Sequence, residues 1–331
     1  MTEFRKDTII NRWVIIAAER ARRPSDLAEQ TTEYAKGGFC PFDVGNETAT
    51  PPEVFAMRNQ GTLPDTPGWQ VRVVNNLYPA LSVKDKPLIT NCGLYLSMGG
   101  YGTHEVMIEG TDHEKQFADF DDQAILRVFL TWQERIRFHK KNSAVCYIQI
   151  FKNHGKRGGA SLEHTHSQLV AMPFVPGLVE QEIRGAQDYF NTNNRCVYCD
   201  LLKQVRENKV YLVAHDSHVV SFCPHASRYP FETWVIPTQH QAGFEDADQE
   251  TLFKTGRNLG LVLRSLNRVL NRPSYNFVLH TNPAQSGSAN YHWHIEVIPI
   301  TTSIAGFERA TDCIINTMAP EKAAEFLREG L

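Results

Sequence analysis

The chain contains the same arrangement of strand, loop and histidine pair twice, and this internal repeat limits the folds that it can adopt. Residues 144–174 read A-V-C-Y-I-Q-I-F-K-N, then a glycine-rich loop, then H-T-H-S-Q-L-V-A-M-P. Residues 274–299 read S-Y-N-F-V-L-H-T-N, then a loop of small residues, then H-W-H-I-E-V-I-P. Each copy predicts two strands joined by a flexible loop, with an H-x-H motif opening the second strand.

The similarity extends upstream of both strand pairs. Each pair follows an amphipathic stretch with helical spacing, at 124–139 and 252–270, which is entered through an Asp-rich turn. Before each helix lies a strand with a histidine at one end, at 103–109 and 232–240, and each half begins near C-x-x-C or C-x-x-D. We therefore predict an α+β fold of two tandem units, 1–180 and 181–331, with antiparallel sheets and helices packed on one face.

The first H-x-H motif lies among residues that suit phosphate chemistry. Side chains alternate along a strand, so His164 and His166 share one face and favour a metal, a phosphate or each other as partner. A solvated strand face is the alternative interpretation. Gly159 and Ser161 precede the motif, and Gln168 follows it, which is typical of a loop and strand that cradle phosphate oxygens.

A basic run near the N-terminus, R-A-R-R at 20–23, is most often a solvated turn. Because the H-x-H region predicts a phosphate site elsewhere in the chain, Arg20 and Arg23 are also candidate phosphate ligands.

The cysteines predict metal sites. Cys196 and Cys199 have metal-ligand spacing, and the repeat supplies His240 and His292 as the two further ligands of a tetrahedral site. The corresponding set in the first half consists of Cys40, Asp43, His104 and His164. Four protein ligands leave no position for water, so structural zinc is the preferred interpretation, with the first set the weaker because Asp43 stands in place of a cysteine.

Composition narrows the class of protein. The formal net charge of −3 over 331 residues argues against a nucleic-acid-binding protein. The N-terminus lacks the apolar stretch of a signal peptide, and no segment has the length of a membrane span. We expect a cytoplasmic protein.

These motifs resemble the galactose-1-phosphate uridylyltransferase family, the branch of the histidine-triad superfamily built from two tandem units. The matching segments cover nearly the full length of the chain: N-R-W-V-I-I-A-A-E-R-A-R-R-P at 11–24, V-R-V-V-N-N-L-Y-P-A-L at 71–81, G-T-H-E-V-M-I-E at 102–109, F-K-N and S-L-E-H-T-H-S-Q within 151–168, Y-P-F-E-T-W-V-I-P at 229–237, and H-W-H-I-E-V-I-P with G-F-E within 292–308. The resemblance implies that the first unit carries the nucleophile, and that the second carries a zinc site and a hexose-binding loop.

The resemblance also implies a mechanism. His166, the second histidine of H-x-H-x-Q, would attack the α-phosphorus of UDP-glucose, release glucose 1-phosphate and pass UMP to galactose 1-phosphate in a ping-pong reaction. Gln168 and Ser161 would stabilise the phosphate charge. His164 falls on a zinc-ligand position. The remaining substrate-binding positions are Arg20, Arg23, Asn75, Asn76, Asn153, Gly159, Phe307 and Glu308.

Two further features follow from this resemblance. The family completes its active site across a dimer interface, which implies a homodimer. The second motif has Glu296 where the first has Gln168, and a carboxylate there would repel a phosphate, so only the first copy is expected to be catalytic.

Several alternatives stay open on the sequence. The sister family of ADP-glucose phosphorylases shares the S-L-E-H-x-H-S-Q loop and uses inorganic phosphate as acceptor, and phosphorolysis of dinucleoside polyphosphates is a related possibility. The loop around G-F-E departs from the pattern of the uridylyltransferases, which leaves the sugar and the acceptor undecided. A zinc-stabilised binding module is a non-catalytic alternative. A metal-dependent hydrolase would need an open metal position, which the ligand count does not leave.

Overall fold

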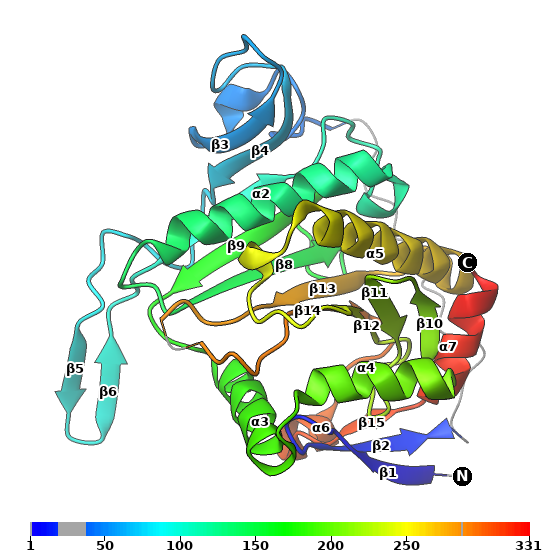
Figure 1. Cartoon of the computed structure of the whole chain (residues 1–331). Helices are drawn as coiled ribbons and strands as arrows, with labels where there is room; N and C mark the ends of the chain where they lie inside the picture. Colours follow the sequence, from blue (N-terminus) through cyan, green and yellow to red (C-terminus); the bar gives the residue numbers. More distant parts are fainter. Residues whose placement is uncertain (1, 19–37, 286) are drawn as a thin grey trace.

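Ten strands form one large antiparallel sheet in the order β10-β11-β12-β14-β13-β8-β9-β7-β4-β3 (Figure 1). The computed structural model describes residues 2–18, 38–285 and 287–331. The strands of the sheet are β3 (Glu53–Arg58), β4 (Trp69–Asn75), β7 (Thr103–Ile108), β8 (Tyr147–His154), β9 (His166–Met172), β10 (Leu212–His215), β11 (Val219–Phe222), β12 (Thr233–Pro237), β13 (Tyr275–His280) and β14 (His294–Pro299).

The sheet consists of two five-stranded halves with the same connectivity. In chain order, each half has three strands, then a long helix, then the two strands that flank the flexible loop. The halves meet where β8 pairs with β13, and the register there runs from Tyr275 opposite His154 to Leu279 opposite Ile150. This arrangement confirms the expected α+β fold of two tandem histidine-triad-like units.

The two long helices, α2 (Asp122–Lys140) and α5 (Gln249–Leu270), lie side by side on one face of the sheet (Figure 1). Each begins after an aspartate whose side chain accepts a hydrogen bond from a backbone N–H three residues on, Asp121 from Ala124 and Asp248 from Thr251. Gly256 on α5 leaves room for Ile125 of α2, because a Cβ there would lie 2.7 Å from its Cγ2 atom. Apolar side chains of both helices and of both half-sheets form the main core.

The opposite face is covered differently in the two halves. Helices α3 (Gly177–Asn193) and α4 (Val197–Asn208) pack on the C-terminal half and form a second hydrophobic cluster with β11 and β12. On the N-terminal half, the segment around Cys40 and Phe42 packs against β4 and β7 in a smaller cluster. The expected unit boundary after residue 180 lies within α3, so the division at that residue stays a prediction.

The chain ends form a separate small sheet. Strands β1 (Thr2–Lys6) and β2 (Trp13–Ala17) pair antiparallel, and β15 (Ile314–Asn316) adds to β2 in parallel. Helices α6 (Gly306–Thr311) and α7 (Pro320–Glu329) flank β15 in the chain. A hairpin of β5 (Ile89–Cys92) and β6 (Tyr95–Met98) projects from the body of the molecule (Figure 1). Among the described residues, no helix combines the length and the apolar character needed to cross a membrane.

Candidate active site and metal-binding clusters

His166 opens β9 and faces away from α2 and α5. The next residue, Ser167, accepts a hydrogen bond from the indole of Trp132 on α2, so strand alternation turns His166 to the other face. The residue is 6% exposed, and its Nδ1 lies 2.8 Å from the carbonyl oxygen of His164. Because a carbonyl can only accept, Nδ1 carries the proton and Nε2 keeps its lone pair. Burial, and then the charge of Lys152, lower the pKa of His166 to about 4, which leaves a neutral imidazole for nucleophilic attack.

A buried ion pair supports the backbone at His166. The Nζ atom of Lys152 on β8 lies 2.6 Å from Glu109 Oε2, 2.7 Å from Thr165 Oγ1 and 2.9 Å from the carbonyl oxygen of His166. Lys152 and Glu109 are 1% and 2% exposed. The pair therefore anchors the strand on both sides of the histidine. The roles of Lys152 and Glu109 could not be predicted from the sequence, since a lysine within a strand gives no signal that it is buried.

Gln168 is oriented by His104 on the adjacent strand β7. The backbone N–H of Ala80 donates to His104 Nδ1 at 3.2 Å, so His104 Nε2 carries the proton and donates to Gln168 Oε1 at 2.8 Å. This bond uses the oxygen of the Gln168 amide. The amide nitrogen of Gln168 has no hydrogen-bond partner among the described residues. The amide N–H groups are therefore available to phosphate oxygens beside His166. The amide nitrogen of Asn76 lies 3.2 Å from His104 Nε2, and in this tautomer the contact is not a hydrogen bond because both nitrogens carry protons.

The glycine-rich loop between β8 and β9 includes a backbone conformation that favours glycine. Gly159 has a φ of +86°, which an L side chain rarely adopts. Asn276 of β13 donates to Asn153 Oδ1 at 2.8 Å and to the carbonyl oxygen of Gly158 at 2.7 Å, and so holds the loop from the second half of the sheet. The β8–β9 register ends with Phe151 opposite Gln168.

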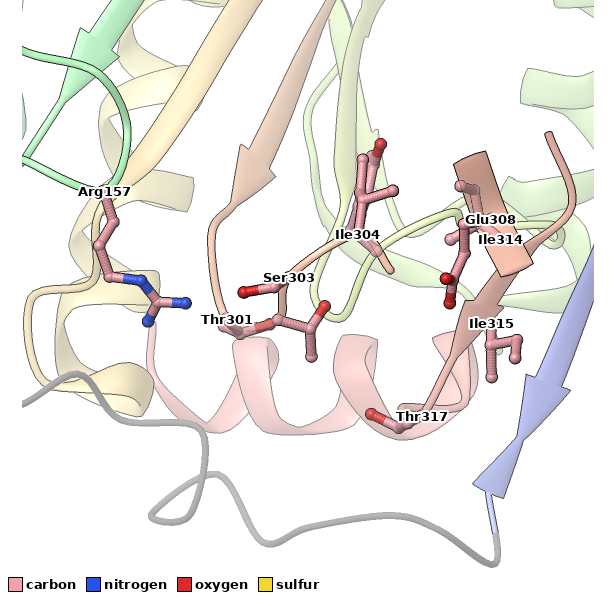
Figure 2. Close-up of a pocket in the computed structure, with 10 residues that line it drawn as sticks. Arg157, Thr301, Ser303, Ile304, Glu308, Ile314, Ile315 and Thr317 are labelled. Carbon is pink, nitrogen blue, oxygen red and sulfur yellow. The ribbon is translucent and has the colours of Figure 1, made fainter. Parts of the chain in front are cut away.

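The other expected substrate-binding residues are distributed around this centre. Ser161 and Asn75 have exposed positions. Phe307 is 47% exposed, and Glu308 lines a pocket with Arg157 of the glycine loop (Figure 2). Arg20 and Arg23 lie outside the described residues.

The first group of residues that could hold a metal contains His113 instead of His104. Ligand atoms of Cys40, Asp43, His113 and His164 all lie within 4.8 Å of one another. Asp43 Oδ1 is 2.7 Å from His113 Nδ1 and 3.0 Å from His164 Nδ1. The expectation of His104 as a ligand is therefore wrong, because its position at the start of β7 directs it to Gln168. The internal repeat could have identified His113, because it follows the end of β7 as His240 follows the end of β12.

The donor set of this first cluster fits zinc. A thiol, a carboxylate and two imidazoles are all groups that bind this metal. His164 Nε2 lies 2.7 Å from the carbonyl oxygen of Gly110, which turns Nδ1 toward the other donors.

The second cluster has the expected members, Cys196, Cys199, His240 and His292, with ligand atoms within 4.8 Å of one another. Cys199 Sγ lies 3.6 Å from His240 Nδ1 and 3.7 Å from His292 Nδ1. Zinc with ordinary Zn–S and Zn–N bond lengths would separate such ligands by about 3.6 Å in a tetrahedron. Both histidines donate Nε2–H to backbone carbonyls, of Ala289 at 2.8 Å and Pro237 at 3.0 Å, which fixes the tautomer that presents Nδ1.

A third group of close donors, Glu182, His280, His294 and Glu296, is fully buried in the C-terminal half. His280 Nδ1 lies 3.1 Å from Glu182 Oε2, and its Nε2 lies 3.6 Å from Glu296 Oε2. Arg228 also donates to Glu296. The carboxylates of Glu182 and Glu296 thus pair with His280, and Arg228 adds a second cation. The group forms a buried ion network.

The chain is similar to known proteins in sequence and in fold. The family model described as galactose-1-phosphate uridyl transferase, N-terminal domain, matches residues 1–176, and a domain of unknown function, DUF4921, matches residues 101–329. ADP-glucose phosphorylase of Arabidopsis thaliana is 36% identical over 99% of this chain and 92% of its own. Galactose-1-phosphate uridylyltransferase of Thermotoga maritima is 26% identical over 99% of this chain and 98% of its own.

One solved structure extends the likeness to three dimensions. An ADP-glucose phosphorylase from Arabidopsis thaliana with bound ADP-glucose superimposes with a TM-score of 0.84 at 33% identity, over 99% of this chain and 98% of that one. The fold, the repeated H-x-H motif and these matches together show that the chain belongs to the galactose-1-phosphate uridylyltransferase family.

Proposed function

We propose that the protein transfers a nucleotidyl group from a nucleotide sugar to a phosphate-bearing acceptor through a covalent intermediate on His166. Nε2 of His166 forms a bond to the α-phosphorus, the P–O bond to the leaving sugar 1-phosphate breaks, and that oxygen keeps the electron pair. The acceptor phosphate then attacks the same phosphorus and frees the histidine. The observation that carries this proposal is the neutral imidazole with its Nε2 lone pair beside the oriented amide of Gln168.

The uridylyl form of this reaction, from UDP-glucose to galactose 1-phosphate, fits the family model that matches the first half of the chain. It assigns the chain to carbohydrate metabolism. Ser161, Gly159 and Asn153 would bind the phosphates, Asn75 and Asn76 the nucleotide, Phe307 and Glu308 the hexose, and Arg20 and Arg23 further phosphate oxygens.

The second candidate is phosphorolysis of ADP-glucose, with inorganic phosphate as acceptor. A specific observation favours it: the identity to ADP-glucose phosphorylase is 36%, against 26% to the uridylyltransferase over a similar length. Both candidates use His166 in the same way, so the donor nucleotide distinguishes them.

One labelling experiment tests the class and the donor together. The protein is incubated without acceptor with UDP-glucose or ADP-glucose, each labelled at the α-phosphate, and acid-labile label on the protein is measured. We expect label on the wild type and none on His166→Gly. The donor that labels identifies the candidate. Absence of label from both donors contradicts the proposal.

We also propose zinc in both four-residue clusters, in a structural role. Zinc in the first cluster would tie the segment at Cys40 to His164, two residues before the nucleophile. Metal analysis of the purified protein is expected to give two zinc ions per chain. One zinc per chain would show that Asp43 does not complete a site. Seven free cysteines suit a reducing compartment, which supports the cytoplasm as location.

The β5–β6 hairpin supports a homodimer. Leu88, Ile89, Leu94, Tyr95 and Leu96 are each at least 63% exposed on it. A two-stranded hairpin is marginally stable in water, so an apolar surface that covers it would stabilise it. We expect a dimer by light scattering and a monomer for the double variant Leu94→Asp, Leu96→Asp with unchanged circular dichroism. A monomeric wild type contradicts the proposal.

A further inference from the structure

The two four-residue clusters that could hold a metal differ in one donor group. The second contains two thiols, Cys196 and Cys199, whereas the first contains the single thiol of Cys40 and has the carboxylate of Asp43 in place of the other. Two neighbouring thiols can be oxidised reversibly to a disulfide, and a carboxylate cannot take part in that bond. Of the two clusters, only the second therefore holds both groups for reversible oxidation among its own ligands.

Cys196 and Cys199 have the spacing that a disulfide requires. Cys196 directly precedes α4, Cys199 lies in the first turn of this helix, and their Sγ atoms are within 4.8 Å of each other. Residues three apart at the start of a helix have Cα atoms about 5 Å apart, which is within the range of disulfides. The C-x-x-C motif is also the arrangement that many proteins use for thiol–disulfide exchange. The bond can therefore form without rearrangement of α4.

An open groove gives small molecules access to Cys199. It has a volume of ≈ 420 Å³, which is in the range of small-molecule sites, and it is lined by Cys199, Leu202, Lys203, Arg206, Glu207 and Thr238. Neither Lys203 nor Arg206 forms an ion pair with a carboxylate of the described residues. Two cations against the single carboxylate of Glu207 give the groove an excess of positive charge, which favours an anionic molecule.

The two cysteines differ in access. Cys199 lines the groove, whereas Cys196 does not, and the Sγ atom of Cys196 lies 3.7 Å from the carbonyl oxygen of Asn290. A reagent in the groove therefore meets Cys199 first. Cys196 is the neighbouring thiol that can complete the exchange.

We propose that Cys196 and Cys199 are a redox-sensitive pair, which reacts with a small anionic disulfide in this groove and closes an intramolecular disulfide. The Cys199 thiolate attacks one sulfur of the reagent, a mixed disulfide forms, and the first thiolate of the reagent leaves. The Cys196 thiolate then attacks the Cys199 sulfur and displaces the second thiolate. Two electrons pass from the cysteine pair to the reagent, which is reduced to two thiolates.

Oxidation also removes two ligands from the second cluster, so that His240 and His292 remain as its only donors. A zinc ion held by two histidines alone binds much more weakly, and we expect it to leave as Zn²⁺. This part of the inference rests on the zinc proposed above for the cluster, whereas formation of the disulfide does not. The first cluster keeps its zinc, because Asp43 cannot be oxidised by the same reagent.

Treatment of the purified protein with glutathione disulfide, whose carboxylates make it anionic, tests the inference. Released zinc is measured with a chromogenic chelator, and peptide mass spectrometry locates the disulfide. We expect a Cys196–Cys199 bond and the loss of one zinc ion per chain, both reversed by dithiothreitol with added zinc. Cys199→Asp reproduces the C-x-x-D pattern of the first cluster and should keep its zinc through the same treatment. The wild-type measurements stand even where this variant binds no zinc.

The charge of the groove supplies a second comparison. Lys203→Gln should react with glutathione disulfide about threefold more slowly than the wild type, because one attractive charge is lost. Lys254→Gln is the matched control, since it removes the same charge from α5 on the opposite face of the sheet, and it should react like the wild type. The cationic disulfide cystamine should not be slowed by Lys203→Gln.

Three results would overturn the inference: no Cys196–Cys199 bond in the treated wild type, zinc loss without this bond, or equal rates for Lys203→Gln and Lys254→Gln. Failure of both nucleotide sugars to label His166 would refute the proposed nucleotidyl transfer and leave a measured disulfide unaffected. Disulfide formation in a protein that holds no zinc at this cluster would refute the zinc proposal alone.

Discussion

His166 and His294 share one hydrogen-bonding arrangement. In each, Nδ1 faces the carbonyl oxygen of the histidine two residues earlier, at 2.8 and 3.0 Å, and burial contributes most to lowering the pKa to about 4. Their surroundings differ: His294 is 0% exposed and stacks between the rings of Trp234 and His280. Closer packing therefore distinguishes His294 from His166, in addition to the neighbouring Glu296.

We expect substitution of His113 to lower the zinc content, and substitution of His104 to slow label transfer to His166. His113→Ala removes a ligand of the first cluster and should lower the zinc content by about one ion per chain. His104→Ala leaves that cluster intact and should keep the zinc content, while label transfer to His166 slows because Gln168 loses its orienting bond. Metal analysis and labelling rates of both variants check this. Zinc loss in His104→Ala would contradict the assignment.

Lys152 and Glu109 should behave as a coupled pair. Lys152→Met leaves the Glu109 carboxylate buried without its cation, and we expect the free energy of unfolding to fall by about 3–5 kcal/mol. The double variant Lys152→Met, Glu109→Leu removes both charges and should recover most of this loss. Urea unfolding of the two variants measures the coupling. Additive losses would show that the ion pair is not the source of the effect.

At the scale of elements, α3 determines how the N-terminal segment approaches the C-terminal half. Ile9 packs into the cluster formed by α3, α4 and the sheet. Its carbonyl oxygen comes so close to Gly185 on α3 that a Cβ there would lie 1.8 Å away. The helix can accept the chain at this distance only because residue 185 has no side chain.

Alanine at Gly185 should therefore destabilise the protein, although alanine favours a helix by about 1 kcal/mol over glycine. The backbone of Ile9 must move away from α3, and such overpacking typically costs about 1–3 kcal/mol. Gly177→Ala in the same helix meets nothing within 4 Å and is expected to be neutral or slightly stabilising. Thermal unfolding of both variants provides the comparison, and equal midpoints would be evidence against the close contact.

At the scale of the whole molecule, the two units form one continuous sheet and share their functional parts. The pairing of β8 with β13 brings Asn276 of the second unit to the glycine loop of the first. The candidate site thus depends on both units. The buried network around His280 in the C-terminal half should contribute to how global stability depends on pH.

Burial alone would lower the pKa of His280, but the charges of Glu182 and Glu296 outweigh it and raise the pKa to about 10. The ordinary value in an unfolded chain is about 6.5. A raised pKa means that this stabilisation is complete below pH 6.5 and is lost as the pH rises toward 10. We expect His280→Gln to be less stable than the wild type at pH 7 and to lose less stability between pH 7 and 10. Urea unfolding across this range tests the expectation, and parallel curves would refute it.

Much of the fold and part of the candidate site could be predicted because they depend on local patterns. The tandem units follow from the repeated order of strand, helix and H-x-H motif. The grouping of Cys196, Cys199, His240 and His292, which the structure brings together, follows from spacing and from the repeat. His113 was missed because one histidine, His104, opens β7 and another, His113, follows its end, and only packing shows which one reaches Asp43.

The sequence by itself determined that the chain repeats one α+β unit, and that H-x-H-x-Q and paired cysteines occur at the spacings of phosphate and metal chemistry. Periodicity and spacing are local properties, so they can be read before folding is known. The tertiary structure alone decided that His104 orients Gln168, that Lys152 pairs with Glu109, that His294 is sealed, and that Arg157 lies across a pocket from Glu308. These relations join residues far apart in the chain, and they arise only when the strands and loops pack in three dimensions.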